Sequence, residues 1–98
     1  MMATNGEADA RPVIVYVDEI EDERANFYTD AFNSKRFSEI HLVPPSAELD
    51  DIMACLLDMH FDALVTDFNL SEAAVVNYNG GDLVERFLTV KREFPCFI

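Results

Sequence analysis

The chain is poor in basic residues and has no long apolar run, and each shortage argues against a class of protein. Seven lysines and arginines stand against 19 aspartates and glutamates over 98 residues, so the formal charge is −12. Sequence-independent binding to nucleic acid depends on basic side chains that neutralise phosphates, so we expect no direct contact with nucleic acid. The apolar runs are far too short to cross a bilayer, so we expect no membrane association.

Cysteine is also scarce, and its placement predicts no disulfide framework. Cys55 and Cys96 lie in apolar surroundings without C-x-x-C spacing, so we expect both to be small core residues in a reducing compartment. Residues 1–10 are small, polar and acidic, which is the opposite of a signal peptide, and we expect a disordered leader over residues 1–11. These features predict a soluble cytoplasmic protein with one domain over residues 12–98.

Half of the chain is apolar, and its apolar residues form short runs that alternate with helical patterns. Four runs predict strands, at residues 13–17, 38–43, 61–66 and 95–98. Three segments with apolar residues at helical spacing predict helices, from about Glu21 to Asn33, from an N-cap at Ser46 to Leu57, and over residues 83–88 after a turn at 79–81. The order βαβαβαβ predicts an α/β fold with a parallel sheet and right-handed crossovers.

Two of the predicted strands end at acidic residues. Asp18 and Glu19 follow the first strand, and Asp67 follows Thr66 at the end of the third. Parallel strands bring their carboxyl ends to one rim, where such sheets bind ligands, so we expect the three carboxylates to meet. Their oxygen ligands favour Mg²⁺ or Mn²⁺. The alternative is that these acids cap helices or are solvated at the rim.

Other polar residues have simpler interpretations. Glu21, Asp22 and Glu23 are typical of a solvated helix start that the helix dipole favours. His41 and His60 lack metal-ligand spacing with each other or with cysteine, so we expect surface or half-buried residues.

Three segments, in this order, resemble the receiver domain of two-component response regulators over roughly residues 12–98. Val13-Ile-Val-Tyr-Val-Asp-Glu19 is similar to that family's first strand with its acidic pair. Asp62-Ala-Leu-Val-Thr-Asp-Phe-Asn-Leu70 is similar to the third strand with its phospho-accepting aspartate. Asn79-Gly80 followed by Asp82-Leu83-Val84 matches the turn and helix that come next. The resemblance implies a flavodoxin-like, receiver-type parallel sheet.

The resemblance also implies a chemistry. Asp67 would accept a phosphoryl group from a histidine kinase or phosphotransfer protein and become an aspartyl phosphate. Mg²⁺ would be held by the side chains of Glu19 and Asp67 and the backbone carbonyl of Asn69, with Asp18 reaching it through water. The chain would then be a regulatory phosphoprotein that catalyses only its own phosphotransfer. A hydrolase with a nucleophilic aspartate would need a second acid at position 69. This chain has Asn69 there, which argues against that alternative.

The sequence departs from the family beside the aspartate. The segment between Asp67 and Gly80 is longer than is usual in the family, and Glu72 to Tyr78 resembles an insertion. Val75, Val76 and Tyr78 are its apolar anchors. The loop is either a lid or partner-contact surface, or a segment that simply packs these three residues down.

A second hypothesis follows from what the family has after its fourth strand. Its Thr or Ser at the end of that strand, its Lys at the end of the fifth and its last helices would lie beyond Ile98. The chain would then be a receiver-like interaction module, a pseudo-receiver completed by a partner or second chain without stable phosphorylation. One sheet face would be covered by the first helix alone, and an edge at Pro95–Ile98 would invite pairing or homo-oligomers. Apolar side chains expected to be exposed are Val13, Val15, Val17, Leu64 and Phe97.

Overall fold

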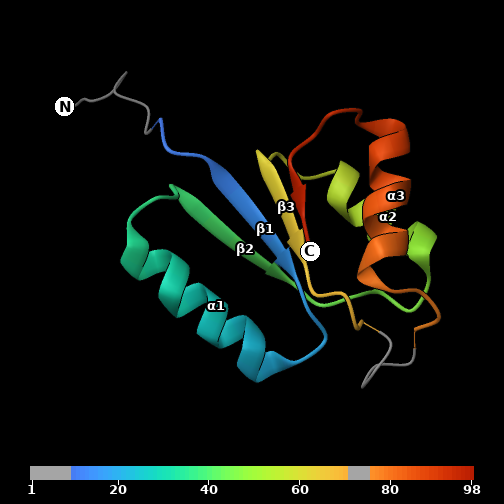
Figure 1. Ribbon diagram of the computed structural model, residues 1–98, viewed down its shortest axis with the longest axis horizontal. Helices are drawn as coiled ribbons and strands as arrows, with labels where there is room; N and C mark the ends of the chain where they lie inside the picture. Colours follow the sequence, from blue (N-terminus) through green and yellow to red (C-terminus); the bar gives the residue numbers. More distant parts are fainter. Residues whose placement is uncertain (1–9, 71–75) are drawn as a thin grey trace.

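The computed structural model describes residues 10–70 and 76–98, which form a parallel sheet with helices on both faces (Figure 1). The strands are β1 (Val13–Val17), β2 (Glu39–Val43), β3 (Ala63–Thr66) and β4 (Cys96–Phe97). The helices are α1 (Glu21–Ser34), α2 (Leu49–Leu57) and α3 (Gly80–Val90). The strands lie in the order β2-β1-β3-β4 and all pairs are parallel. The predicted α/β class and element order are confirmed.

The ends of two helices differ from the prediction. Helix α2 begins at Leu49 after Glu48, which makes no side-chain cap, so the predicted N-cap at Ser46 is wrong. The carbonyl of Ser46 instead accepts a hydrogen bond from the Tyr78 hydroxyl, at 2.5 Å. The turn predicted at residues 79–81 is partly helical, because α3 starts at Gly80. The predicted leader at residues 1–11 lies outside the described residues, apart from its last two.

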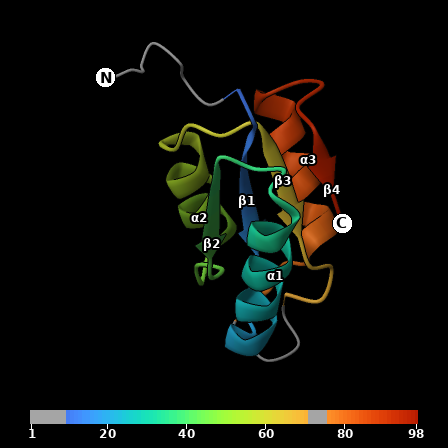
Figure 2. The same ribbon diagram turned by 90° about the vertical axis from the view of Figure 1, so that its left-hand side faces the viewer.

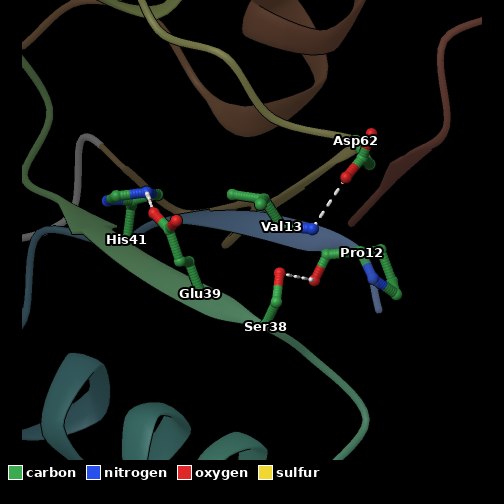
Figure 3. A network of polar contacts seen from close by, with 6 residues as sticks. All are labelled: Pro12, Val13, Ser38, Glu39, His41 and Asp62. Atoms are coloured by element: carbon green, nitrogen blue, oxygen red, sulfur yellow. Dashed lines mark hydrogen bonds and ion pairs between the residues drawn. The ribbon is translucent and has the colours of Figure 1, made fainter. Parts of the chain in front are cut away.

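Polar contacts fix β1 at its amino end (Figure 3). The N–H of Val13 donates to Oδ2 of Asp62 at 2.8 Å, and the N–H of Asp62 donates to the carbonyl of Val13, also at 2.8 Å. Beside them, the hydroxyl of Ser38 donates to the carbonyl of Pro12 at 3.4 Å. A slip of one residue would turn every side chain of a strand to the other face, so these contacts help to set which residues reach the core.

The hydrophobic core lies between the sheet and the helix pair α2 and α3 (Figure 1). Its buried members are Val15, Val17, Ile52, Met53, Leu56, Leu64, Leu70, Tyr78, Leu83 and Phe87. The ring of Phe87 packs edge-on against Phe94, with centroids 5.1 Å apart, and tilted against Phe61 at 5.8 Å. Such aromatic contacts add to the stabilisation that apolar burial provides.

Helix α1 covers the opposite face, where it lies against β2 and β1 (Figures 1 and 2). The predicted exposure of Val15, Val17 and Leu64 is wrong, because these three residues point to the α2 and α3 side and are fully buried. Alternate strand residues face opposite sides, so their neighbours take the α1 side. Phe97 is 57% exposed as predicted, and Val13 is half-buried.

Cysteine and histidine positions were predicted with mixed success. Cys55 is exposed on α2, so its predicted core position is wrong. Cys96 is half-buried, and this burial raises the pKa of its thiol. His41 is half-buried, with Nε2 3.0 Å from Oε1 of Glu39 (Figure 3), and His60 is exposed, as expected. No helix among the described residues combines the length and apolarity that a membrane span requires.

Candidate functional site

The carboxyl ends of β1 and β3 lie side by side at one rim of the sheet. Val17 is paired with Thr66, so Asp18 and Asp67 directly follow partner residues on neighbouring strands. In the order β2-β1-β3-β4, the chain moves outward from β1 to β2 and then crosses back to β3. Ligands of parallel α/β sheets bind where the connections change direction in this way.

Three carboxylates meet at this rim. Oxygen atoms of Asp18, Glu23 and Asp67 all lie within 4.8 Å of one another. Asp18 is buried, Asp67 is half-buried, and Glu23 reaches the group from the exposed first turn of α1. Carboxylate oxygens at this spacing fit a hard divalent cation such as Mg²⁺ or Mn²⁺.

Asp18 is held in place from several sides. The hydroxyl of Tyr16 donates to its Oδ2 at 2.5 Å, and the N–H of Ile20 donates to its Oδ1 at 3.0 Å. The guanidinium of Arg24 donates to its main-chain carbonyl at 2.6 Å. Tyr16 is itself stacked on Phe27 of α1, with ring centroids 4.1 Å apart and planes 8° from parallel. The carboxylate therefore has a fixed orientation toward the rim.

Burial is the largest cause that raises the pKa of Tyr16 well above its ordinary value. The hydrogen bond to Asp18 raises it further, and so do the negative charges of Asp18, Asp67 and Glu23. The phenol therefore stays protonated at neutral pH and keeps donating to the aspartate.

Contact with Asp18 raises the pKa of Glu23. The side-chain hydrogen bond with Asp18 is the main cause that raises the pKa of Glu23, followed by the charge of Asp18, with burial, Asp67 and Glu19 adding to it. Carboxyl groups in such contact resist ionising together because their charges repel. A divalent cation offers another way to hold the same charges together, so we expect cation and proton to compete here.

Asp67 is oriented by its own neighbours along the chain. The N–H of Asn69 donates to Oδ2 of Asp67 at 3.1 Å, and the hydroxyl of Thr66 donates to its carbonyl at 3.0 Å. The N–H of Asp67 donates to the carbonyl of Val17 at 2.9 Å, which ties the end of β3 to β1. Asp67 as a whole is half-buried, unlike Asp18, which is fully buried.

The start of α3 is packed directly against Asp67. A Cβ atom at Gly80 would overlap the carbonyl oxygen of Asp67, so this close approach requires glycine. The N–H of Gly80 donates to the carbonyl of Phe68 at 2.8 Å. Asn79 and Asp82 form a capping box, in which each side chain accepts the other's backbone N–H, at 2.8 and 3.0 Å.

The predicted site residues are thus only partly gathered. Asp18 and Asp67 lie together, and Asn69 contacts Asp67 through its N–H. Both carboxylate oxygens of Glu19 are buried, but Glu19 is not in the acidic group found among the described residues. Glu23 is in that group, although its sequence favoured a solvated helix start. Its place in the first turn of the helix that follows Asp18 is the sequence feature that could have indicated Glu23 as a site residue.

The segment Glu72 to Tyr78, which the resemblance to receiver domains suggested as an insertion, is described in part. Tyr78 is buried and Val76 is half-buried against the core, as expected of apolar anchors. The rest of Glu72 to Tyr78, including Val75, lies outside the described residues apart from Asn77, which is exposed.

Comparison of the chain with protein-family models, with curated proteins and with solved structures gives no match. The site is therefore interpreted from its own geometry. That geometry combines a half-buried carboxylate, Asp67, with two further carboxylates suited to a cation. A nucleophilic carboxylate beside a cation site is suited to the transfer of an anionic group such as phosphoryl.

Proposed function

We propose that this chain is a receiver-like signalling domain that accepts a phosphoryl group on Asp67 in the presence of Mg²⁺. The observation that carries the proposal is the acidic group at the paired ends of β1 and β3, where Asp18, Glu23 and Asp67 come within 4.8 Å. The strand order β2-β1-β3-β4 is compatible with the flavodoxin-like sheet of receiver domains. The donor would be a phosphohistidine on a histidine kinase or phosphotransfer protein.

The transfer needs one bond formed and one broken. A carboxylate oxygen of Asp67 attacks the phosphorus, and the bond between phosphorus and the histidine nitrogen breaks. The electron pair of that bond stays on the imidazole nitrogen, and Asp67 becomes an acyl phosphate. Mg²⁺ held by the carboxylates at the rim would supply charge neutralisation on the phosphoryl oxygens.

The chain's own residues supply position and cation ligands. The N–H of Asn69 orients the carboxylate of Asp67 through Oδ2. Asp18 and Glu23 are the further carboxylates near enough to share a cation with Asp67. The resemblance adds Glu19 and the carbonyl of Asn69 to that set.

A direct test is incubation with Mg²⁺ and acetyl phosphate, followed by intact-mass measurement. We expect one phosphoryl group on the wild type and on Asp58→Asn, a control at an exposed acid after α2. Asp67→Asn should show none while keeping the wild-type circular dichroism spectrum. Chelation by EDTA should abolish the adduct, and hydroxylamine should remove it because an acyl phosphate is labile.

Two outcomes would contradict the proposal. One is an equal adduct on Asp67→Asn, which would locate the acceptor elsewhere. The other is a folded wild type that gains no phosphoryl group, which would favour the second candidate function.

That second candidate is an interaction module that binds a partner without stable phosphorylation. The specific observation that favours it is an open apolar groove beside α1, on the sheet face away from the core.

A further inference from the structure

The groove beside α1 has a volume of about 660 Å³ and lies on the sheet face opposite the core. Seven of its ten lining residues are apolar. Helix α1 supplies one wall, and β1, β3 and β4 supply the floor and far edge. The apolar lining residues that α1 and the strands contribute are Ile14, Phe27, Ala31, Ala63, Val65 and Phe97.

Parallel sheets are normally covered on both faces, and the face beside α1 is covered only in part. Parallel sheets in proteins are covered by helices on both faces, because their strands are apolar on both sides. Here α1 lies against β2 and β1, while Val65 and Phe97, paired on β3 and β4, remain in the groove. Phe97 is 57% and Ile98 is 63% exposed, so apolar surface faces solvent at the far edge.

The shape of the edge favours a helix over an added strand. Strand β4 has two residues, so it offers few main-chain hydrogen bonds to an incoming strand. The groove runs beside a helix over a parallel sheet, which is the place where such folds pack a second helix.

Charge indicates what kind of helix fits. Helix α1 has four acids and one basic residue, Arg24; three of the acids lie in its first turn, outside the groove lining, and the fourth is Asp30. Asp30 lines the groove, and so does Arg36, which lies just after the end of α1. The whole chain has a formal charge of −12, so a second copy would be repelled and a basic partner attracted.

We propose that the groove binds an amphipathic α-helix of a partner protein, with an apolar stripe against Val65 and Phe97 and with Lys or Arg beside α1. This inference does not depend on phosphorylation of Asp67. It specifies the partner that the interaction module would have.

The test uses a synthetic helix of about 18 residues, with leucines along one stripe and lysines elsewhere, against a matched peptide with glutamates in place of lysines. Binding to the full chain is followed by fluorescence anisotropy, and helix formation by circular dichroism. We expect the Leu/Lys peptide to bind at least about tenfold more tightly than the Leu/Glu peptide.

Variants locate the binding surface. Phe97→Glu should weaken binding of the Leu/Lys peptide by about tenfold or more, because it places a charge among apolar contacts. Phe32→Glu is the matched control, because Phe32 is 62% exposed on α1 but does not line the groove. Asp30→Lys, at an exposed position, should weaken binding of the Leu/Lys peptide and strengthen binding of the Leu/Glu peptide. This variant tests the inference if Phe97→Glu fails to fold.

Several results would overturn the inference. Equal affinity for the two peptides, or equal loss in Phe97→Glu and Phe32→Glu, would mean that binding does not use this groove. Concentration-dependent dimers that Phe97→Glu dissolves would assign the face to a second copy. In EDTA, Asp67→Asn should bind the peptide as the wild type does, so failure of the phosphoryl proposal leaves this result unaffected.

Discussion

The two faces of the sheet use neighbouring residues of the same strands but are covered to different extents. Leu64 is fully buried between the sheet and the pair α2 and α3, whereas Val65, the next residue, lines an open groove beside α1. Among the helices, α3 buries Leu83 and Phe87, while α1 buries only Ala31. The buried core thus lies on the α2 and α3 face, whereas the α1 face keeps an open apolar groove.

The helices flanking the site differ in the same way. Helix α3 is fixed to the end of β3 by close backbone packing of Gly80 on Asp67 and by the hydrogen bond from the Gly80 N–H to the carbonyl of Phe68. Helix α1 is joined to the site by side chains, through the carboxyl contact of Glu23 with Asp18 and the stack of Phe27 on Tyr16. Cation binding and pH should therefore act on the α1 side more than on the α3 side.

The largest effect should separate the two faces at adjacent positions of β3. Leu64→Ala should lower the free energy of unfolding by about 2 to 5 kcal/mol, because it leaves a cavity in the core. Val65→Ala should cost markedly less, since Val65 already borders an open groove. Urea denaturation of both variants measures the difference, and equal losses would show that the two faces are packed alike.

A smaller effect should appear where α3 meets Asp67. Gly80→Ala should destabilise the protein by about 1 to 3 kcal/mol, because its methyl group would overlap the carbonyl of Asp67. Gly81→Ala is the matched control, because the nearest atoms to its methyl group belong to side chains and not to the backbone. They are Oδ1 of Asn79 at 3.1 Å and the ring of Phe68 at 3.4 Å. Thermal melts compare the two. A Gly80→Ala variant as stable as Gly81→Ala would argue against tight packing at the site.

The smallest effect concerns pH and the α1 side. Because the pKa of Glu23 is raised in the folded state, the stability it contributes is present below its ordinary pKa and is lost as pH rises through the folded value. Glu23→Gln should therefore be more stable than wild type at neutral pH in EDTA, with less gain on acidification.

Melting temperatures measured from about pH 7 to about pH 5 test this sign. Glu21→Gln, at an exposed acid of the same helical turn, should retain the wild-type dependence. Mg²⁺ should raise the melting temperature of wild type more than that of Glu23→Gln. Identical pH slopes for wild type and Glu23→Gln would mean that the carboxyl pair does not hold a proton.

Much of the fold could be predicted because it depends on local pattern. The β-branched run predicted β1 at its observed bounds, Val13–Val17, and the alternation of strands and helices predicted the parallel sheet. The start of α2 was missed because Glu48 precedes the helix without a side-chain cap, so no capping residue marks its first turn. Which face of β1 is buried was also missed, since both sides of that strand are apolar.

The candidate site was predicted in the same uneven way. Asp18 and Asp67 could be placed together from strand ends alone, because parallel strands bring their carboxyl ends to the same rim of the sheet. Glu23 could not, because its position depends on the angle at which α1 leaves the strand. Ile20 has an extended backbone there, with φ −97° and ψ 117°, and this turns the first helical residues back toward the rim.

The stack of Phe27 on Tyr16 connects the groove with the acidic site. Phe27 lines the groove on one side, and Tyr16 donates its hydroxyl to Asp18 on the other. An occupant of the groove that displaces the Phe27 ring would change how Asp18 is held, and with it the affinity for a cation. Thermodynamic linkage makes this effect reciprocal, so a cation at the rim would alter the affinity for that occupant by the same factor.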